Sequence, residues 1–182
     1  MDEKILQILR PKTESQIKES LENTADVNRR LYLSVKHNRL EDVKNALASG
    51  ADPSFDRNFS FIISANPKID LEIFKLLLID PRVNLSDRDN VTLFISTGAG
   101  DLDRINLILQ DFRFTPDKHA GIKRAILWGI AHRQIAAVKL LLSNEKIKKV
   151  IAEKELKLFS KKIKKLIDAE NYINKQANEK YI

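Results

Sequence analysis

The chain has 182 residues, of which 43% are hydrophobic and 31% charged, so it can bury one ordinary core and is not a disordered chain. It contains no cysteine, which excludes disulfide frameworks, thiolate zinc sites and cysteine nucleophiles. The net charge of +7 is uneven, because the 11 lysines and 6 acidic residues after Asn144 leave only +2 for the rest of the chain.

The first segment, residues 1–28, is predicted to be an N-terminal helical cap. Thr13 and Gln16 have the spacing of a capping box, which predicts a helix running through Ile17 and Leu21. The extreme N-terminus is acidic where a signal peptide is basic, and no apolar run approaches the ~18 residues of a membrane span. We therefore expect a cytoplasmic protein.

A helical pattern of apolar residues at i, i+3, i+6 and i+7 recurs at intervals of 31, 31 and 33 residues. Its four copies begin at Leu40, Leu71, Leu102 and Ile135. An upstream helix in each copy pairs an apolar position with a small one, at Leu31 and Ser34, Ile62 and Ala65, Leu93 and Ser96, and Ile126 and Gly129. Helical hairpins of this kind cannot bury their apolar faces alone, so they must stack. The predicted units are 29–59, 60–90, 91–123 and 124–144.

The segment Leu40-Glu41-Asp42-Val43, followed by Ser49-Gly50-Ala51-Asp52-Pro53, is similar to the ankyrin repeat family, as is Gly100-Asp101-Leu102. The family's Thr-Pro-Leu-His opening is missing, and its glycine between the helices survives only as Gly100. Such degenerate repeats resemble those of giant-virus and intracellular-bacterial ankyrin proteins. The resemblance implies an all-α solenoid of four repeats with helical caps. It also implies a non-enzymatic scaffold for a protein partner, which would be a host protein if the source is a pathogen or virus.

In the ankyrin family, partners sit on the concave face, which the first helices and the turn tips line. The resemblance places on the face of the first helices Leu33, His37, Ser64, Lys68, Ile95, Ala99, Trp128 and His132. It places at the turn tips Asp56, Arg57, Asn58, Arg88, Asp89, Asn90, Lys118 and His119. The apolar members of the first set predict a groove anchored by Trp128, since tryptophan is enriched at interface hot spots. The alternatives are that Trp128 packs under the basic tail and that the tips are ordinary solvated turns.

The tail, residues 145–182, is predicted to form a basic amphipathic helix. Its apolar positions are Leu156, Phe159, Ile163, Leu166, Ile167 and Ile173. Its opposite arc carries Lys157, Lys161, Lys164 and Lys165. Three roles fit this pattern: a C-terminal cap on the array, an anchor on an anionic membrane, and non-specific contact with nucleic acid. The tail has no arginine and few aromatic residues, which argues against reading a nucleic-acid sequence.

No pattern of catalytic or metal-ligating residues emerges from the sequence. His37 and His132 occupy equivalent positions in the first and fourth units, too far apart to share a metal. Gly98-Ala99-Gly100 is not followed by the Lys and Ser or Thr of a phosphate loop. We therefore expect a monomer that is not an enzyme and that holds neither a cofactor nor a metal.

Overall fold

The structure is a computed structural model that describes residues 13–116 and 119–179, with the side chains of His119 and of residues 173–179 left undescribed. Within these ranges the chain is helical and contains no strand. The helices are α2 (Glu14–Glu22), α3 (Val27–Lys36), α4 (Leu40–Ala48), α5 (Phe55–Ser64), α6 (Leu71–Leu78), α7 (Asp87–Ala99), α8 (Leu102–Gln110), α9 (His119–Ala131), α10 (Ile135–Ser143), α11 (Glu145–Val150) and α12 (Glu153–Glu179).

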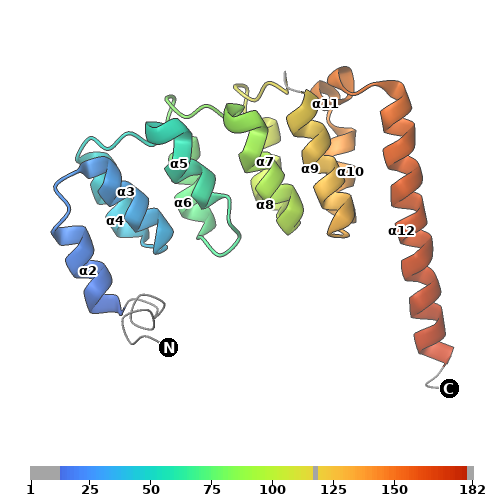
Figure 1. Ribbon diagram of the computed structural model, residues 1–182, viewed down its shortest axis with the longest axis horizontal. Coiled ribbons are helices and arrows are strands. Elements are labelled where there is room, and N and C mark those ends of the chain that lie inside the picture. Colours follow the sequence, from blue (N-terminus) through green and yellow to red (C-terminus); the bar gives the residue numbers. More distant parts are fainter. Residues whose placement is uncertain (1–12, 117–118, 180–182) are drawn as a thin grey trace, which may run out of the picture.

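In the described part of the chain, four helix pairs stand side by side in one row: α3 with α4, α5 with α6, α7 with α8, and α9 with α10 (Figure 1). Helix α2 lies at one end of the row against α3, and α12 lies at the other end against α9. The second helices begin at Leu40, Leu71, Leu102 and Ile135, the four residues at which the sequence pattern begins. The all-helical class predicted from the sequence is thus confirmed.

The core runs along the row, between the two helices of each pair and between neighbouring pairs. Leu31, Leu93 and Ile126 are fully buried, as the repeated pattern predicts. At Gly129 an added Cβ would lie 2.6 Å from Val138 Cγ2 and 2.8 Å from Thr97 Cγ2. No side chain larger than hydrogen fits there, so the small residue sets how closely α9 approaches its neighbours.

Helix α5 does not follow the register that the sequence predicted. Residues 56–58 and 88–90 have left-handed backbones with φ between 47° and 60°, and the two turns lie 32 residues apart. With that offset Phe61 matches Leu93 and Ser64 matches Ser96, and all four side chains are buried. Placing Ser64 on the exposed face was therefore wrong. Its hydroxyl donates to the Phe61 carbonyl at 2.6 Å inside the core.

Cationic side chains join successive loops by reaching back to carbonyl groups of the preceding loop. The bonds run from Arg82 to Ala51 O at 3.2 Å, from Arg113 to Asp80 O at 2.7 Å, and from Lys146 to Phe114 O at 3.0 Å. Because each bond crosses from one unit to the previous one, the set holds neighbouring pairs in a fixed register.

Two of these cations are oriented by carboxylates in their own loops. Asp80 accepts from Arg82 at 2.7 Å, and Asp111 accepts from Arg113 at 2.7 Å. The hydrogen bonds from the guanidinium groups are the main reason that the pKa of both carboxyls lies below the ordinary aspartate value. Both carboxylates thus stabilise the joints between units while they are ionised.

Arg104 of α8 is a buried cation, only 4% exposed. Its Nε donates to the Ser64 carbonyl at 3.0 Å, and its terminal nitrogens donate to the Ile69 carbonyl and the Asp101 carboxylate. These bonds satisfy the carbonyl at the end of α5 and a second one in the connection to α6, which explains how a charged residue is accommodated there.

The predicted capping box at the N-terminal end is present. The backbone nitrogen of Gln16 donates to the Thr13 hydroxyl at 3.3 Å, and the backbone nitrogen of Thr13 donates to the side-chain oxygen of Gln16 at 2.9 Å. Helix α2 buries Leu21, while residues 1–12 of the predicted cap lie outside the described part. Helix α3 begins at Val27, two residues before the predicted start of the first unit, because Asp26 caps it.

Candidate partner-binding surface

The only tryptophan of the chain lies at the centre of an aromatic cluster on the first helices of the last two pairs. Trp128 of α9 stacks on Phe94 of α7, with ring centroids 5.3 Å apart and planes at 27°. The His132 ring is also close, with its centroid 4.0 Å from that of the indole. The Arg124 guanidinium lies 4.9 Å from the Phe94 ring centroid, within reach of a cation–π interaction.

The Trp128 indole rests directly on the backbone of α7. A Cβ added at Gly98 would lie 2.2 Å from both Cδ1 and Nε1 of the indole, so only glycine allows this approach. The side chain nevertheless remains 42% exposed. Its stacking partners belong to α7 and α9, so packing under the basic tail is not how Trp128 is held.

A shallow hollow of about 370 Å³ opens beside this cluster. Its described lining consists of Phe94, Ala120, Lys123, Arg124, Leu127 and Trp128. None of these residues carries a carboxylate, so the hollow is apolar with a cationic edge. Two cations, Lys123 and Arg124, form this edge. Lys123 makes an ion pair with Glu155 of α12 at 2.7 Å, whereas Arg124 makes none with a described residue.

A second aromatic pair lies at the other end of the same row of first helices. Tyr32 of α3 stacks on Phe59 of α5, with centroids 5.5 Å apart, and Arg88 lies 5.6 Å from the Phe59 centroid. Tyr32 and Phe59 border a hollow of about 230 Å³ whose lining also includes Asp26, Asp56 and Arg29. The sequence analysis missed Tyr32, Phe59 and Phe94. These three residues are aromatic and lie in the first helices of their units. Aligning the repeated units would have shown that pattern in the sequence.

The remaining residues predicted for this face vary in exposure. Leu33, His37 and Ile95 are half-buried, while Lys68 and His132 are exposed. The His132 Nδ1 lies 3.0 Å from the Trp128 carbonyl oxygen, which fixes the ring against the indole. The predicted apolar row is therefore interrupted at its second position, where Ser64 is buried, and is most exposed at Trp128.

Two predicted turn-tip residues are buried, which contradicts their assignment to a partner surface. Asn58 is 3% exposed and Asn90 is 0% exposed. The Asn58 amide donates to the Asp87 carboxylate at 2.7 Å, and its oxygen accepts from the Asn84 nitrogen at 3.0 Å. Asn58 thus joins two units. The Asn90 amide has no hydrogen-bond partner among the described residues.

The other turn tips fit a polar edge of the surface. Arg57 and Asp89 are exposed, and Arg57 lies 3.6 Å from the Asp87 carboxylate. Arg88 is half-buried and donates to the Asp56 carbonyl at 2.9 Å. Lys118 and the side chain of His119 lie outside the described residues.

The tail divides into α11 and α12 rather than forming one helix, and α12 is amphipathic as predicted. Its apolar residues face the array: Phe159 is 1% and Ile163 6% exposed. The predicted basic residues Lys157, Lys161, Lys164 and Lys165 are exposed. Because the buried face is the one that a membrane-lying helix would insert, the fold favours the role of a cap. The side chain of Ile173 is not described.

Acidic residues and histidines of the described part were compared with the arrangements that hold metal ions. No group of three or more His, Asp or Glu side chains there is placed to hold a metal ion. The aspartates with lowered pKa, Asp80 and Asp111, are bound by arginines in structural loops. Within the described ranges, no helix is both long and apolar enough to cross a bilayer.

Comparison with models of known protein families, with curated proteins and with solved structures found no match for this chain. The similarity to ankyrin repeats therefore rests on the chain's own residues.

Proposed function

We propose that residues 27–143 form a degenerate ankyrin-type array of four repeats whose first-helix face binds a protein partner. Four stacked helix pairs support this, as does the spacing of 31, 31 and 33 residues between the starts of their second helices. The Gly50-Ala51-Asp52-Pro53 turn after the first pair adds the family's characteristic connection. The proposed role is non-enzymatic, and a source in a pathogen or virus would make the partner a host protein.

The observation that carries the proposal is the half-exposed Trp128, fixed between Phe94, His132 and Gly98. Truncating a hot-spot tryptophan typically costs at least ~2 kcal/mol of binding free energy. An indole that is already held in place loses little side-chain entropy when a partner covers it. The adjoining hollow and the Arg124 guanidinium suit a partner that inserts an apolar side chain beside a carboxylate.

The test is capture of a partner by the full chain at physiological salt, followed by its identification and an affinity measurement. Trp128→Ala is expected to weaken binding about 30-fold or more. Phe112→Ala provides a matched control, because Phe112 is 87% exposed in the loop after α8 and lies outside the cluster. Both variants must first show the cooperative unfolding of the parent chain. Full affinity in a folded Trp128→Ala variant would contradict the proposal.

Removing the tail is not a suitable control, because Phe159 and Ile163 would leave the core that they complete. Point variants address the alternatives instead. The full chain would be tested for binding to anionic vesicles and to nucleic acids of unrelated sequence. If that binding weakens steeply with salt and also weakens in the double variant Lys161→Gln with Lys165→Gln, the tail would be the functional surface.

A further inference from the structure

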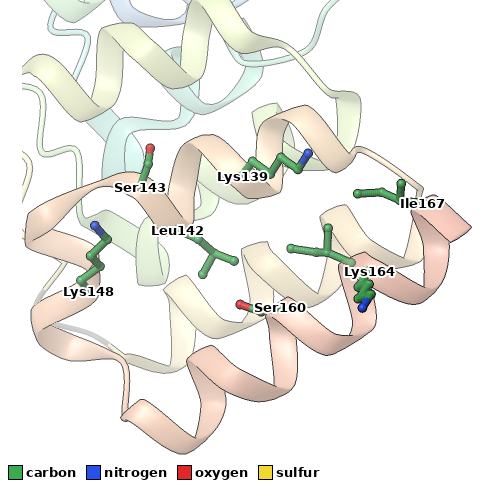
Figure 2. Close-up of a pocket in the computed structure, with 8 residues that line it drawn as sticks. Lys139, Leu142, Ser143, Lys148, Ser160, Lys164 and Ile167 are labelled. Carbon is green, nitrogen blue, oxygen red and sulfur yellow. The ribbon is translucent and has the colours of Figure 1, made fainter.

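A slot separates α12 from α10 at the C-terminal end of the row (Figure 2). Its volume is about 470 Å³, and it is open to solvent along one side, like the shallow hollow beside Trp128. The described lining residues are Lys139, Leu142, Ser143, Lys148, Ser160, Ile163, Lys164 and Ile167. They come from α10, α11 and α12, so the slot exists only because the tail docks on the array.

The interior of the slot is aliphatic. Leu142 of α10 and Ile167 of α12 reach into it from opposite sides in Figure 2. Ile163 of α12 also belongs to its lining. The hydroxyls of Ser143 and Ser160 donate to carbonyls of their own helices at 2.8 and 2.9 Å. Neither hydroxyl proton is therefore available to a ligand, and none of the described lining residues is aromatic. These walls suit a flexible alkyl chain and offer no stacking surface for a planar ring.

The rim of the slot is cationic. Lys139, Lys148 and Lys164 come from three different helices, and none of the described lining residues is acidic. Lys148 is bound to Glu145 at 2.7 Å, whereas Lys139 and Lys164 form no ion pair with a described residue. Lys139 and Lys164 stand on opposite walls, and their exposed, unpaired charges favour an anionic ligand at the rim of the slot.

We propose that this slot binds one medium-chain fatty acid, with its alkyl chain between α10 and α12 and its carboxylate at the rim that Lys139 and Lys164 form. The aliphatic walls select the chain, and the charge of the rim selects the carboxylate. The site is independent of the protein-partner surface, because Trp128 and Phe94 do not line it. An anionic lipid bilayer offers the same combination of alkyl chains and negative charge, and is the alternative ligand. It would engage the outward lysines Lys161 and Lys165 instead.

The first experiment is calorimetric titration of the full chain with octanoate, decanoate and dodecanoate, each below its micelle concentration. One molecule should bind per chain, about fourfold tighter for each added methylene that is buried. Dodecyltrimethylammonium has the same chain length with a cationic head and should not compete. Affinity that does not change with chain length, or equal competition by the cationic amphiphile, would overturn the proposal.

Paired variants separate the slot from a general attraction to positive charge. Lys139→Gln with Lys164→Gln should weaken dodecanoate binding about tenfold. Lys161→Gln with Lys165→Gln removes the same charge from exposed positions outside the described lining and should leave the affinity unchanged. If the control pair weakens binding as much, the proposal fails. It also fails if phosphatidylserine vesicles bind through Lys161 and Lys165 while monomeric dodecanoate does not bind.

Discussion

Phe159 provides a sharp test of whether α12 caps the array. Its side chain is 1% exposed, so Phe159→Ala removes a fully buried ring from the interface between the tail and the last helix pair. Such truncations cost about 3–5 kcal/mol, from the lost transfer of the ring and from the cavity left behind. For a domain of this size, that loss lowers the melting temperature by roughly 6–20 °C.

The neighbouring residue supplies the control. Leu158 lies on the same helix and is 48% exposed, so Leu158→Ala should cost less than ~1 kcal/mol. Thermal unfolding followed by circular dichroism would measure both variants, and amide hydrogen exchange in α10 would locate the loss. If Phe159→Ala were no more destabilising than Leu158→Ala, α12 would not be part of the cooperative core. The cap, and the slot that depends on it, would then both be refuted.

Three further predictions concern the first helices and the joints between units. Gly98→Ala should displace the Trp128 indole, shift its fluorescence to longer wavelength and weaken partner binding, and an unchanged spectrum would show that the indole does not rest on α7. Arg104→Leu should cost about 3–5 kcal/mol in urea unfolding, because buried carbonyls and a carboxylate lose their donor. Asp111, whose pKa is lowered by its hydrogen bond from Arg113, stabilises the fold only while ionised. That stabilisation is present above the ordinary aspartate pKa and disappears as pH falls through the lowered value. The stability difference between the parent and Asp111→Asn should therefore shrink from neutral pH to about pH 3, and a constant difference would contradict the assignment.

The helices could be predicted because the apolar positions that repeat along the sequence are the positions that the core requires. Leu40, Leu71, Leu102 and Ile135 begin helices in the structure as in the pattern. The amphipathic face of α12 followed from the same periodicity. Apolar residues spaced three or four apart identify the buried face of a helix, and this holds whichever element packs against that face.

The exposure of individual side chains was less predictable, because it depends on turn geometry that hydrophobic spacing does not encode. Three consecutive left-handed residues without glycine cost about 1–2 kcal/mol each, so an ordinary turn was the natural expectation. Instead, residues 56–58 form such a turn, which inserts Asn58 between two units and shifts Ser64 into the core. The direction in which α12 docks also depends on tertiary contacts, such as the ion pair between Lys123 and Glu155.

The joint between α7 and α9, which carries the proposed anchor, is built differently from the joint between α5 and α7. In the earlier joint Asn58 makes two hydrogen bonds to the next unit. The equivalent Asn90 makes none among the described residues, and Pro116, 32 residues after Asn84, has no N–H to offer. A buried, unpaired amide costs ~1–3 kcal/mol, so this joint needs stabilisation beyond the hydrogen bond that the Ser86 hydroxyl donates across it to the Thr115 carbonyl at 2.8 Å.

Close backbone approach supplies that stabilisation. Three of the chain's five glycines, Gly98, Gly121 and Gly129, lie on α7 and α9. An added Cβ would lie 2.1 Å from the Asp89 carbonyl oxygen at Gly121, 2.2 Å from the Trp128 indole at Gly98, and 2.8 Å from Thr97 Cγ2 at Gly129. Dispersion between closely packed helices replaces the missing hydrogen bonds. Because Gly98 also seats the Trp128 indole on α7, the packing that stabilises the joint fixes the anchor of the proposed binding surface.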